Sequence, residues 1–168
     1  MIFKFLSKNF YISFSIVALI YFLDRLSKSY VIQLDKNNLG SDIFNSAYLN
    51  IVLIWNKGIA FGLLSFNESY LYNIISSIIA IIIIVLVIMS LKSQGFKRYS
   101  LLMIVGGALG NLHDRIFFNA VPDFIDFHIG NFHWFIFNVS DIFITLGVIS
   151  MIIVELLDKD EYNYDKNI

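Results

Sequence analysis

The chain has 168 residues, of which 58% are hydrophobic and 15% are charged, and its mean hydropathy is +0.73. Soluble domains carry about 25% charged residues, so this composition excludes an ordinary soluble globular enzyme, and it also excludes a disordered chain. The net charge of −1 excludes a broad basic surface for nucleic acid. The absence of cysteine excludes disulfides, thiolate nucleophiles and cysteine-ligated metals.

Four apolar stretches are long enough to cross a membrane, which takes about 20 residues. The clearest of them, residues 69–91, has no charged residue and lies between Glu68 and Lys92. We place the spans at residues 10–31, 69–91, 99–118 and 134–157. The sequence therefore predicts an all-α membrane protein in which residues 1–168 form one domain, a bundle of four transmembrane helices.

The two loops on the far side of the membrane from the ends of the chain, residues 32–68 and 119–133, contain strand-like segments. Residues 47–56 are rich in β-branched and aromatic side chains, which favours a strand. Residues 124–135 have near-alternating aromatic side chains around Gly130-Asn131, which is typical of a hairpin turn. We therefore expect a small extracytoplasmic β element beside the helices.

The basic residues of the short loops predict the orientation, because cytoplasmic loops carry an excess of lysine and arginine. With four spans, both ends of the chain share one side with the loop between the second and third spans. That side carries Lys4, Lys8, Lys92, Lys97, Arg98, Lys159 and Lys166, whereas the opposite side carries Lys36 and Lys57. We expect both termini in the cytoplasm.

Two carboxylates stand out from this background. Asp141 is the only carboxylate between residues 127 and 154 and would lie about 10 Å below the outer surface of the fourth span, where a lone carboxylate costs roughly 2.5–3.5 kcal/mol. Asp123 follows Pro122, whose ring stiffens the backbone. Two carboxylates that share a proton can activate water without a metal or a thiol. The alternatives are that Asn138 holds Asp141 in a purely structural hydrogen bond and that Asp123 is a solvated loop residue.

Other polar and small residues in the spans have structural explanations. Asp24 and Lys28 are four residues apart on one helix face and can form an ion pair, structural or functional. Gly106, Gly107 and Gly110 permit close helix approach.

Three histidines raise the question of a metal site. His113, His128 and His133, together with Asp126, match no ordered metal-ligand motif. We therefore expect neither a metal site nor a cofactor.

Five sequence blocks, taken together, resemble the bacterial lipoprotein signal peptidases (signal peptidase II), a family of intramembrane aspartic peptidases. The blocks are DRLSK at 24–28, NKGIAFG at 56–62, GGALGNLHDR at 106–115, VPDF at 121–124 and FNVSD at 137–141. Ser140 stands where the family usually has alanine, and Asn119 where glycine is common. Neither difference affects a carboxylate.

The resemblance assigns roles to individual residues. It implies that Asp123 and Asp141 are the catalytic pair and that Asp114 is structural. The residues that it implies for substrate binding are Asp24, Lys28, Asn56, Gly58, Asn111, Arg115 and Asn138.

The resemblance also implies an activity. The expected protein is a monomer of the bacterial inner membrane that contacts membrane lipid but no nucleic acid. It would cut diacylglyceryl-modified prolipoproteins just before the lipidated cysteine, with its active site near the outer surface. The rival functions are a small transporter or proton-relay subunit that uses Asp141 and Asp24, and a metal-dependent lipid-modifying enzyme built on Asp114, Asp123 and Asp126.

Overall fold

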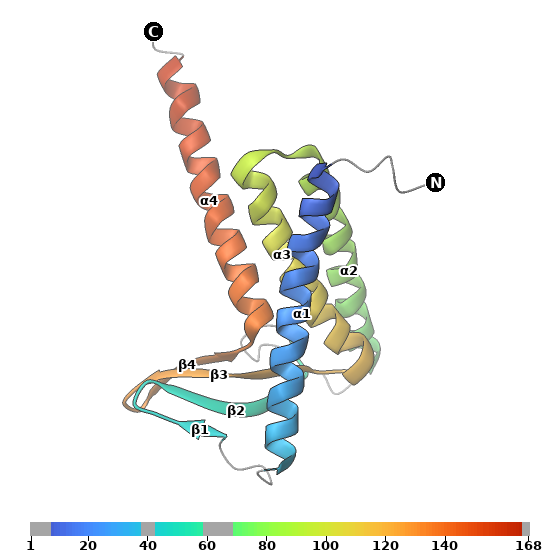
Figure 1. Ribbon diagram of the computed structural model, residues 1–168, viewed down its shortest axis with the longest axis vertical. Helices are drawn as coiled ribbons and strands as arrows, with labels where there is room; N and C mark the ends of the chain where they lie inside the picture. Colours follow the sequence, from blue (N-terminus) through green and yellow to red (C-terminus); the bar gives the residue numbers. More distant parts are fainter. Residues whose placement is uncertain (1–7, 38–42, 59–68, 166–168) are drawn as a thin grey trace.

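Four long helices form the body of the protein (Figure 1). The computed structural model describes residues 8–37, 43–58 and 69–165. The helices are α1 (Lys8–Asn37), α2 (Ser69–Lys92), α3 (Gly95–Phe118) and α4 (Val139–Asp165). Each is long and apolar enough to cross a membrane, as the composition predicts. The expected fold class is confirmed.

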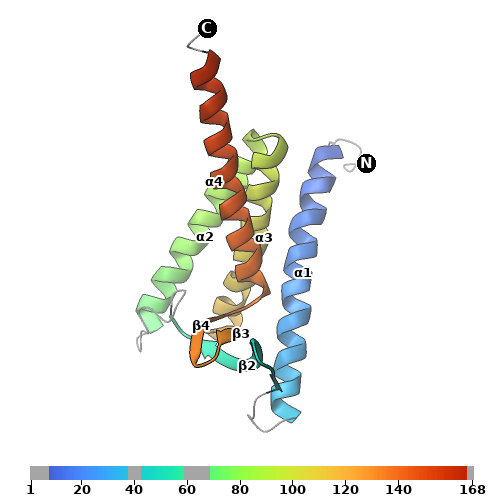
Figure 2. The same cartoon turned by 90° about the vertical axis from the view of Figure 1, so that its left-hand side faces the viewer.

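Helix α3 is the centre of the bundle, since it packs against each of the other three helices. Half of its most apolar segment is buried, compared with 11% in α1, α2 and α4. Figure 2 shows α1 and α2 on opposite sides of α3. The outer helices expose many large aliphatic side chains, a pattern that suits contact with lipid rather than with water.

A four-stranded antiparallel sheet lies at one end of the helices, opposite the start of α1 and the end of α4 (Figures 1 and 2). Its strands, in spatial and chain order, are β1 (Phe44–Asn45), β2 (Leu49–Asn56), β3 (Val121–Ile129) and β4 (Phe132–Phe137). Strands β3 and β4 form the expected hairpin, in which Gly130 has a φ of 57°. Glycine suits that left-handed position because it has no side chain to clash.

The helix boundaries differ from the expected spans in two places. Helix α1 continues to Asn37 rather than ending near residue 31. Helix α4 begins at Val139 rather than at residue 134, because Phe132–Phe137 pair with β3 as the second strand of the hairpin. Asp141 therefore lies in the first turn of α4, about 3 Å along the helix axis from Val139, rather than two turns into a helix that begins at residue 134.

Two glycines of α3 bring the start of α4 close. A Cβ atom on Gly107 would lie 2.5 Å from the backbone oxygen of Ser140, and one on Gly110 would lie 2.3 Å from Ser140 Oγ and 2.6 Å from Asp24 Oδ2. Real Cβ atoms do not approach other atoms so closely, so only glycine fits. The packing interpretation of these glycines is confirmed, and their small size places the first turn of α4 beside the polar residues of α1 and α3.

Candidate active site

Asn138 joins the two predicted catalytic carboxylates, which come from different elements. Its side-chain amide donates to Asp123 Oδ1 on β3 over 2.6 Å. Its backbone N–H donates to Asp141 Oδ2 over 3.2 Å, and its Oδ1 accepts the backbone N–H of Asp141 over 3.1 Å. The last two bonds are a reciprocal N-terminal capping box of α4. One buried residue thus caps the helix and fixes both aspartates.

Each aspartate has a second neutral partner. The Asn56 amide donates to Asp123 Oδ2 over 2.9 Å, and the Asn111 amide donates to Asp141 Oδ1 over 2.8 Å. All four carboxylate oxygens therefore accept an N–H, and within the described residues neither carboxylate forms an ion pair with a lysine or arginine. Because amides orient a carboxylate without cancelling its charge, the pair stays able to share a proton.

Burial raises the pKa of the Asp123 carboxyl from 3.8 to about 6. Desolvation is the main cause, and the nearby negative charge of Asp141 adds to it. The hydrogen bonds from Asn56 and Asn138 oppose the shift because they favour the ionised form. A carboxyl group with a pKa near 6 can hold or release a proton close to neutral pH, as acid–base catalysis requires.

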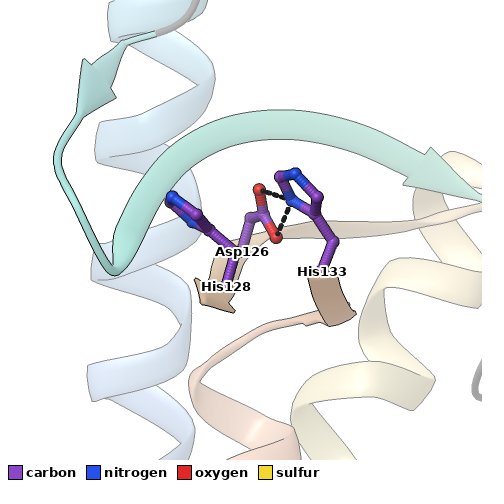
Figure 3. A group of neighbouring side chains, drawn as sticks. All are labelled: Asp126, His128 and His133. Atoms are coloured by element: carbon purple, nitrogen blue, oxygen red, sulfur yellow. Dashed lines mark hydrogen bonds and ion pairs between the residues drawn. The ribbon is translucent and has the colours of Figure 1, made fainter. Parts of the chain in front are cut away.

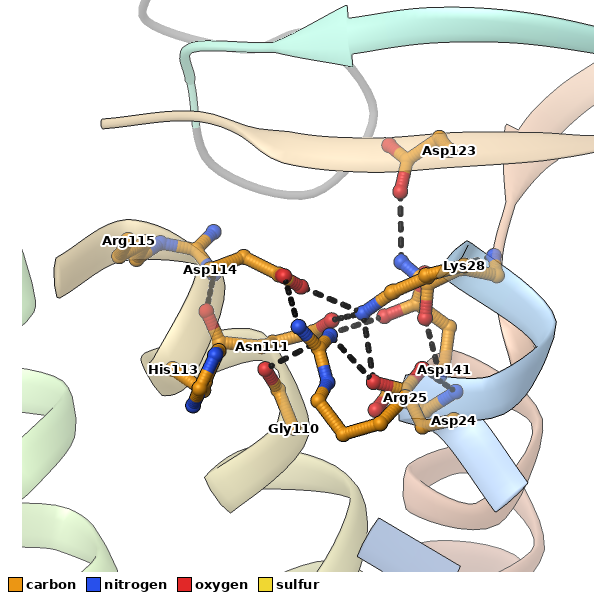
Figure 4. Close-up of polar contacts among 12 residues, drawn as sticks. Asp24, Arg25, Lys28, Gly110, Asn111, His113, Asp114, Arg115, Asp123 and Asp141 are labelled. Atoms are coloured by element: carbon orange, nitrogen blue, oxygen red, sulfur yellow. Dashed lines mark hydrogen bonds and ion pairs between the residues drawn. The ribbon is translucent and has the colours of Figure 1, made fainter. Parts of the chain in front are cut away.

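A buried cluster of two acids and two bases lies behind the aspartates (Figure 4). Arg25 bonds to Asp24 at 2.7 Å and to Asp114 at 2.5 Å, and Lys28 bonds to the same two carboxylates at 2.9 and 2.6 Å. Both aspartate side chains are fully buried. The four charges balance, which offsets part of the large cost of removing them from water. The expected Asp24–Lys28 ion pair is confirmed.

Two bonds connect this cluster to the catalytic candidates. Lys28 Nζ donates to Asn111 Oδ1 over 2.9 Å, which turns the NH₂ end of that amide toward Asp141. Asp24 Oδ1 accepts the backbone N–H of Ser140 over 3.0 Å, at the start of α4, where a helix favours negative charge. The cluster therefore orients the groups around Asp141.

A cavity of about 360 Å³ opens in front of the aspartates. It is lined by the carboxylates and by polar and apolar side chains: Asn56, Ile79, Ala108, Asn111, Arg115, Val121, Asp123, Phe135, Ile136, Phe137, Asp141, Ile144 and Thr145. Arg115 donates to the backbone oxygens of Asn111 and Gly58 over 3.2 and 3.4 Å. Its buried Nε has no partner among the described residues.

The candidate residues thus fall into two groups. Asn56, Asn111 and Arg115 line the cavity with both aspartates, whereas Asp24, Lys28 and Asn138 are buried behind it. Gly58 is also outside the lining; its N–H donates to Asn56 Oδ1 over 2.9 Å and so orients that amide. The rest of the NKGIAFG block, residues 59–62, lies outside the described residues.

Sequence reasoning missed two parts of the site. Arg25, the second base of the cluster, was not among the candidates, although it directly follows Asp24 on a helix that crosses the membrane. The apolar wall formed by Phe135, Ile136 and Phe137 was also missed. It comes from residues that were expected to begin the fourth span.

A separate group with metal-binding chemistry lies on the sheet. Asp126, His128 and His133 each offer one ligand atom, and these atoms lie within 4.8 Å of one another (Figure 3). None of the three lines the cavity described above. His113 is not part of this group; its Nδ1 lies 2.8 Å from the hydroxyl of Tyr21.

Replacing the buried lysine tests the role of the cluster. Lys28→Met should lower the free energy of unfolding by about 3 kcal/mol, because it removes one partner of a buried ion pair. Lys97→Met is the matched control: it breaks an exposed ion pair to Glu155, worth less than about 1 kcal/mol. Thermal unfolding of both variants in detergent is the measurement. Equal losses of stability would contradict a buried, structurally essential cluster.

Comparisons with known proteins agree with one another. The sequence model of the family described as Signal peptidase (SPase) II matches residues 16–157. Lipoprotein signal peptidases from Pelagibacter ubique (strain HTCC1062) and Anaplasma phagocytophilum (strain HZ) are 48% and 43% identical to the chain over 160 and 144 residues. These matches cover 95% and 84% of the chain, and 96% and 89% of the relatives.

Solved structures of bacterial membrane enzymes share the fold of this chain. A bacterial membrane enzyme determined by the in meso method at 2.3 Å resolution has a TM-score of 0.72 and 32% sequence identity, covering 89% of this chain and 90% of the other. A second, at 1.9 Å resolution, has a TM-score of 0.71 and 33% identity, covering 86% and 92%. The chain belongs to the signal peptidase II family.

Proposed function

We propose that the chain is an intramembrane aspartic endopeptidase that removes the signal peptide from diacylglyceryl-modified prolipoproteins. Cleavage would occur just before the lipidated cysteine. The observation that supports this proposal best is that Asp123 and Asp141 line one cavity and share the buried Asn138 as a hydrogen-bonding partner. Membership of the signal peptidase II family and the names of the curated relatives support the peptidase activity and the substrate class.

The proposed reaction needs one water molecule and one proton shared by the two carboxylates. The ionised carboxylate takes a proton from the water as its oxygen attacks the scissile carbonyl, while the protonated one donates to the carbonyl oxygen. The tetrahedral intermediate then collapses, and a carboxyl proton passes to the leaving amine. Because the pair titrates as a unit, the proton belongs to the pair rather than to either residue.

The surrounding residues either position the carboxylates or bind the substrate. Asn56, Asn111 and Asn138 orient the carboxylates through the bonds described above. Arg115 is the substrate-binding donor, since its buried Nε is left without a partner among the described residues. A hydrogen bond from a charged group to a peptide or ester carbonyl is strong in such a poorly solvated site. Asp24, Lys28 and Gly58 act as positioning residues.

A second hollow suits the lipid part of the substrate. It has a volume of about 200 Å³, shares Phe135, Phe137, Asp141 and Thr145 with the main cavity, and is otherwise lined by Ile142 and Leu146. Its lining is almost entirely apolar. We assign acyl-chain contact to this surface, because burying hydrocarbon there is favourable and brings the neighbouring peptide bond to the aspartates.

The chain is proposed to act as a monomer in the bacterial inner membrane, since one chain supplies both carboxylates and every described residue that lines the cavity. The proposed chemistry uses no cofactor and no nucleic acid.

By the excess of basic residues, both termini are cytoplasmic and the sheet lies at the outer surface. A substrate anchored in the outer leaflet could then reach the cavity by lateral movement.

Neutral isosteres test the aspartate pair. Asp123→Asn and Asp141→Asn should each lower the rate of cleavage of a lipidated precursor at least about 1,000-fold, because neither variant can share a proton between two carboxylates. The measurement is the rate of signal-peptide release in detergent. Asp35→Asn makes the same chemical change outside the site and should retain activity. Near-normal turnover by either Asp123→Asn or Asp141→Asn would overturn the proposal.

The pH profile tests the shared proton. The singly protonated pair is lost as pH rises through the pKa of Asp123, so kcat/KM should fall on the alkaline side with an apparent pKa near 6. Asn56→Ala removes a hydrogen bond that lowers the pKa of Asp123. The alkaline limb of the kcat/KM profile of this variant should therefore move to higher pH. Asn50→Ala is the control, since that amide donates to Asp126 instead. If the alkaline limb of Asn56→Ala stays in place, that result would count against Asp123 as a member of the titrating pair.

Single cysteines can report the orientation, because the native chain has none. Tyr48→Cys introduces an exposed thiol beside β2, and Gln94→Cys introduces one between α2 and α3. A membrane-impermeant maleimide should label Tyr48→Cys in intact spheroplasts and Gln94→Cys only after permeabilisation. The reverse pattern would show that the sheet faces the cytoplasm.

A further inference from the structure

Three potential metal ligands share one side of the β3–β4 hairpin. Asp126 and His128 are two residues apart in β3, so their side chains point to the same face. His133 pairs with His128 in register across the hairpin. Figure 3 shows all three side chains beneath the curve of β2. The fold therefore gathers two imidazoles and a carboxylate that the linear sequence keeps apart.

The ligand atoms are already close together. His133 Nδ1 lies 3.1 and 2.9 Å from the two carboxylate oxygens of Asp126. The rings of His128 and His133 stack at a centroid distance of 4.9 Å. One ligand atom from each residue fits within a mutual distance of 4.8 Å. Two imidazole nitrogens and one carboxylate oxygen form a ligand set that suits Zn²⁺.

His128 provides independent support for a ligand. The residue is only 9% exposed, and its Nδ1 has no hydrogen-bond partner among the described residues. A buried polar nitrogen without a partner is costly, and a metal ion satisfies it if the nitrogen acts as a ligand. The unpaired nitrogen belongs to the same residue that the cluster geometry selects.

The charge of the buried Asp126 carboxylate also favours a bound cation. Its carboxylate is 4% exposed, yet residues 119–138 contain no lysine or arginine. Its partners are His133 and the neutral amide of Asn50, which donates over 3.1 Å. The buried carboxylates of Asp24 and Asp114, in contrast, each contact two basic side chains. A divalent cation would compensate the Asp126 charge.

We propose that Asp126, His128 and His133 bind a divalent transition-metal ion of the Zn²⁺ class, with one coordination position left open to water. Tetrahedral ligands at zinc lie about 3.3 Å apart, so one side chain must close a gap of about 1.5 Å. The stacked rings of His128 and His133 are within 18° of parallel, so His133 must also rotate before both in-plane lone pairs can meet at one ion; its side chain, 54% exposed, has room to do so. Its exposure also gives the ion a route to the two buried ligands.

The ion would act as a clamp on the hairpin, separate from the catalytic pair. Asp123 and Asp126 are three residues apart and point to opposite faces of β3. The pairing of β3 with β4 shifts register between Asp126 and His128, so the ion would bridge an irregular part of the ladder. Strand β4 leads directly to Asn138, and a fixed hairpin would stabilise the cavity wall formed by Phe135–Phe137.

Metal titration of the purified full-length chain tests this proposal. The protein is prepared in detergent without a histidine tag, and ZnCl₂ is titrated in a calorimeter. The expected result is one equivalent bound per chain, with Co²⁺ producing the visible absorption of tetrahedral coordination. Free Zn²⁺ at 100 times its Kd should raise the folding equilibrium constant about 100-fold.

Variants separate the site from adventitious binding. His133→Ala removes an exposed ligand, and Asp126→Asn keeps the shape of the side chain; each should weaken Zn²⁺ binding at least about 100-fold and remove the stabilisation. His113→Ala is the matched control and should bind Zn²⁺ as the native chain does. Absence of stoichiometric binding, or equal binding by His133→Ala, would overturn the proposal and leave Asp126 and His133 as a hydrogen-bonded pair.

Discussion

The bonding of Asn138 to both aspartates is the constraint on which the site depends. Two nearby carboxylates repel each other when both are ionised, and Asn138 connects the strand and the helix that carry them. Asn138 supplies an amide to Asp123 and a capping box to Asp141, and it stands where β4 ends and α4 begins. The same bonds that start the helix therefore fix the distance between the two acids.

The buried cluster of Asp24, Arg25, Lys28 and Asp114 extends this control to the helices. Burying four charges is unfavourable unless the pairing is good, and here each acid contacts both bases. The cluster holds Asn111 through Lys28 and the start of α4 through Asp24. Gly110 leaves the room that this arrangement needs. On the surface at the other end of the bundle, Lys97 and Glu155 form an exposed pair. Such a distribution suits one polar site near one surface better than a proton path through the membrane.

Much of the fold was predictable, because apolar length and turn chemistry are local properties. The four helices follow from apolar runs, and the hairpin follows from Gly130-Asn131 between aromatic residues. The start of α4 was not predictable in this way, since Phe132–Phe137 satisfy a helix or a strand equally well by composition. The partners of Asn56, Asn111 and Asn138 depend on side-chain orientation across three elements. The approach of His133 to Asp126 depends on hairpin register, which residue spacing alone does not reveal.

The central claim is that Asp123 and Asp141 act together on one water molecule. The most direct test is a crystal structure with a lipidated peptide analogue in which a hydroxymethylene group replaces the scissile carbonyl. The account predicts that the analogue's hydroxyl lies within hydrogen-bonding distance of both carboxylates, with the guanidinium of Arg115 on a neighbouring carbonyl. A hydroxyl that contacts only one aspartate, or an analogue bound outside the cavity, would contradict it.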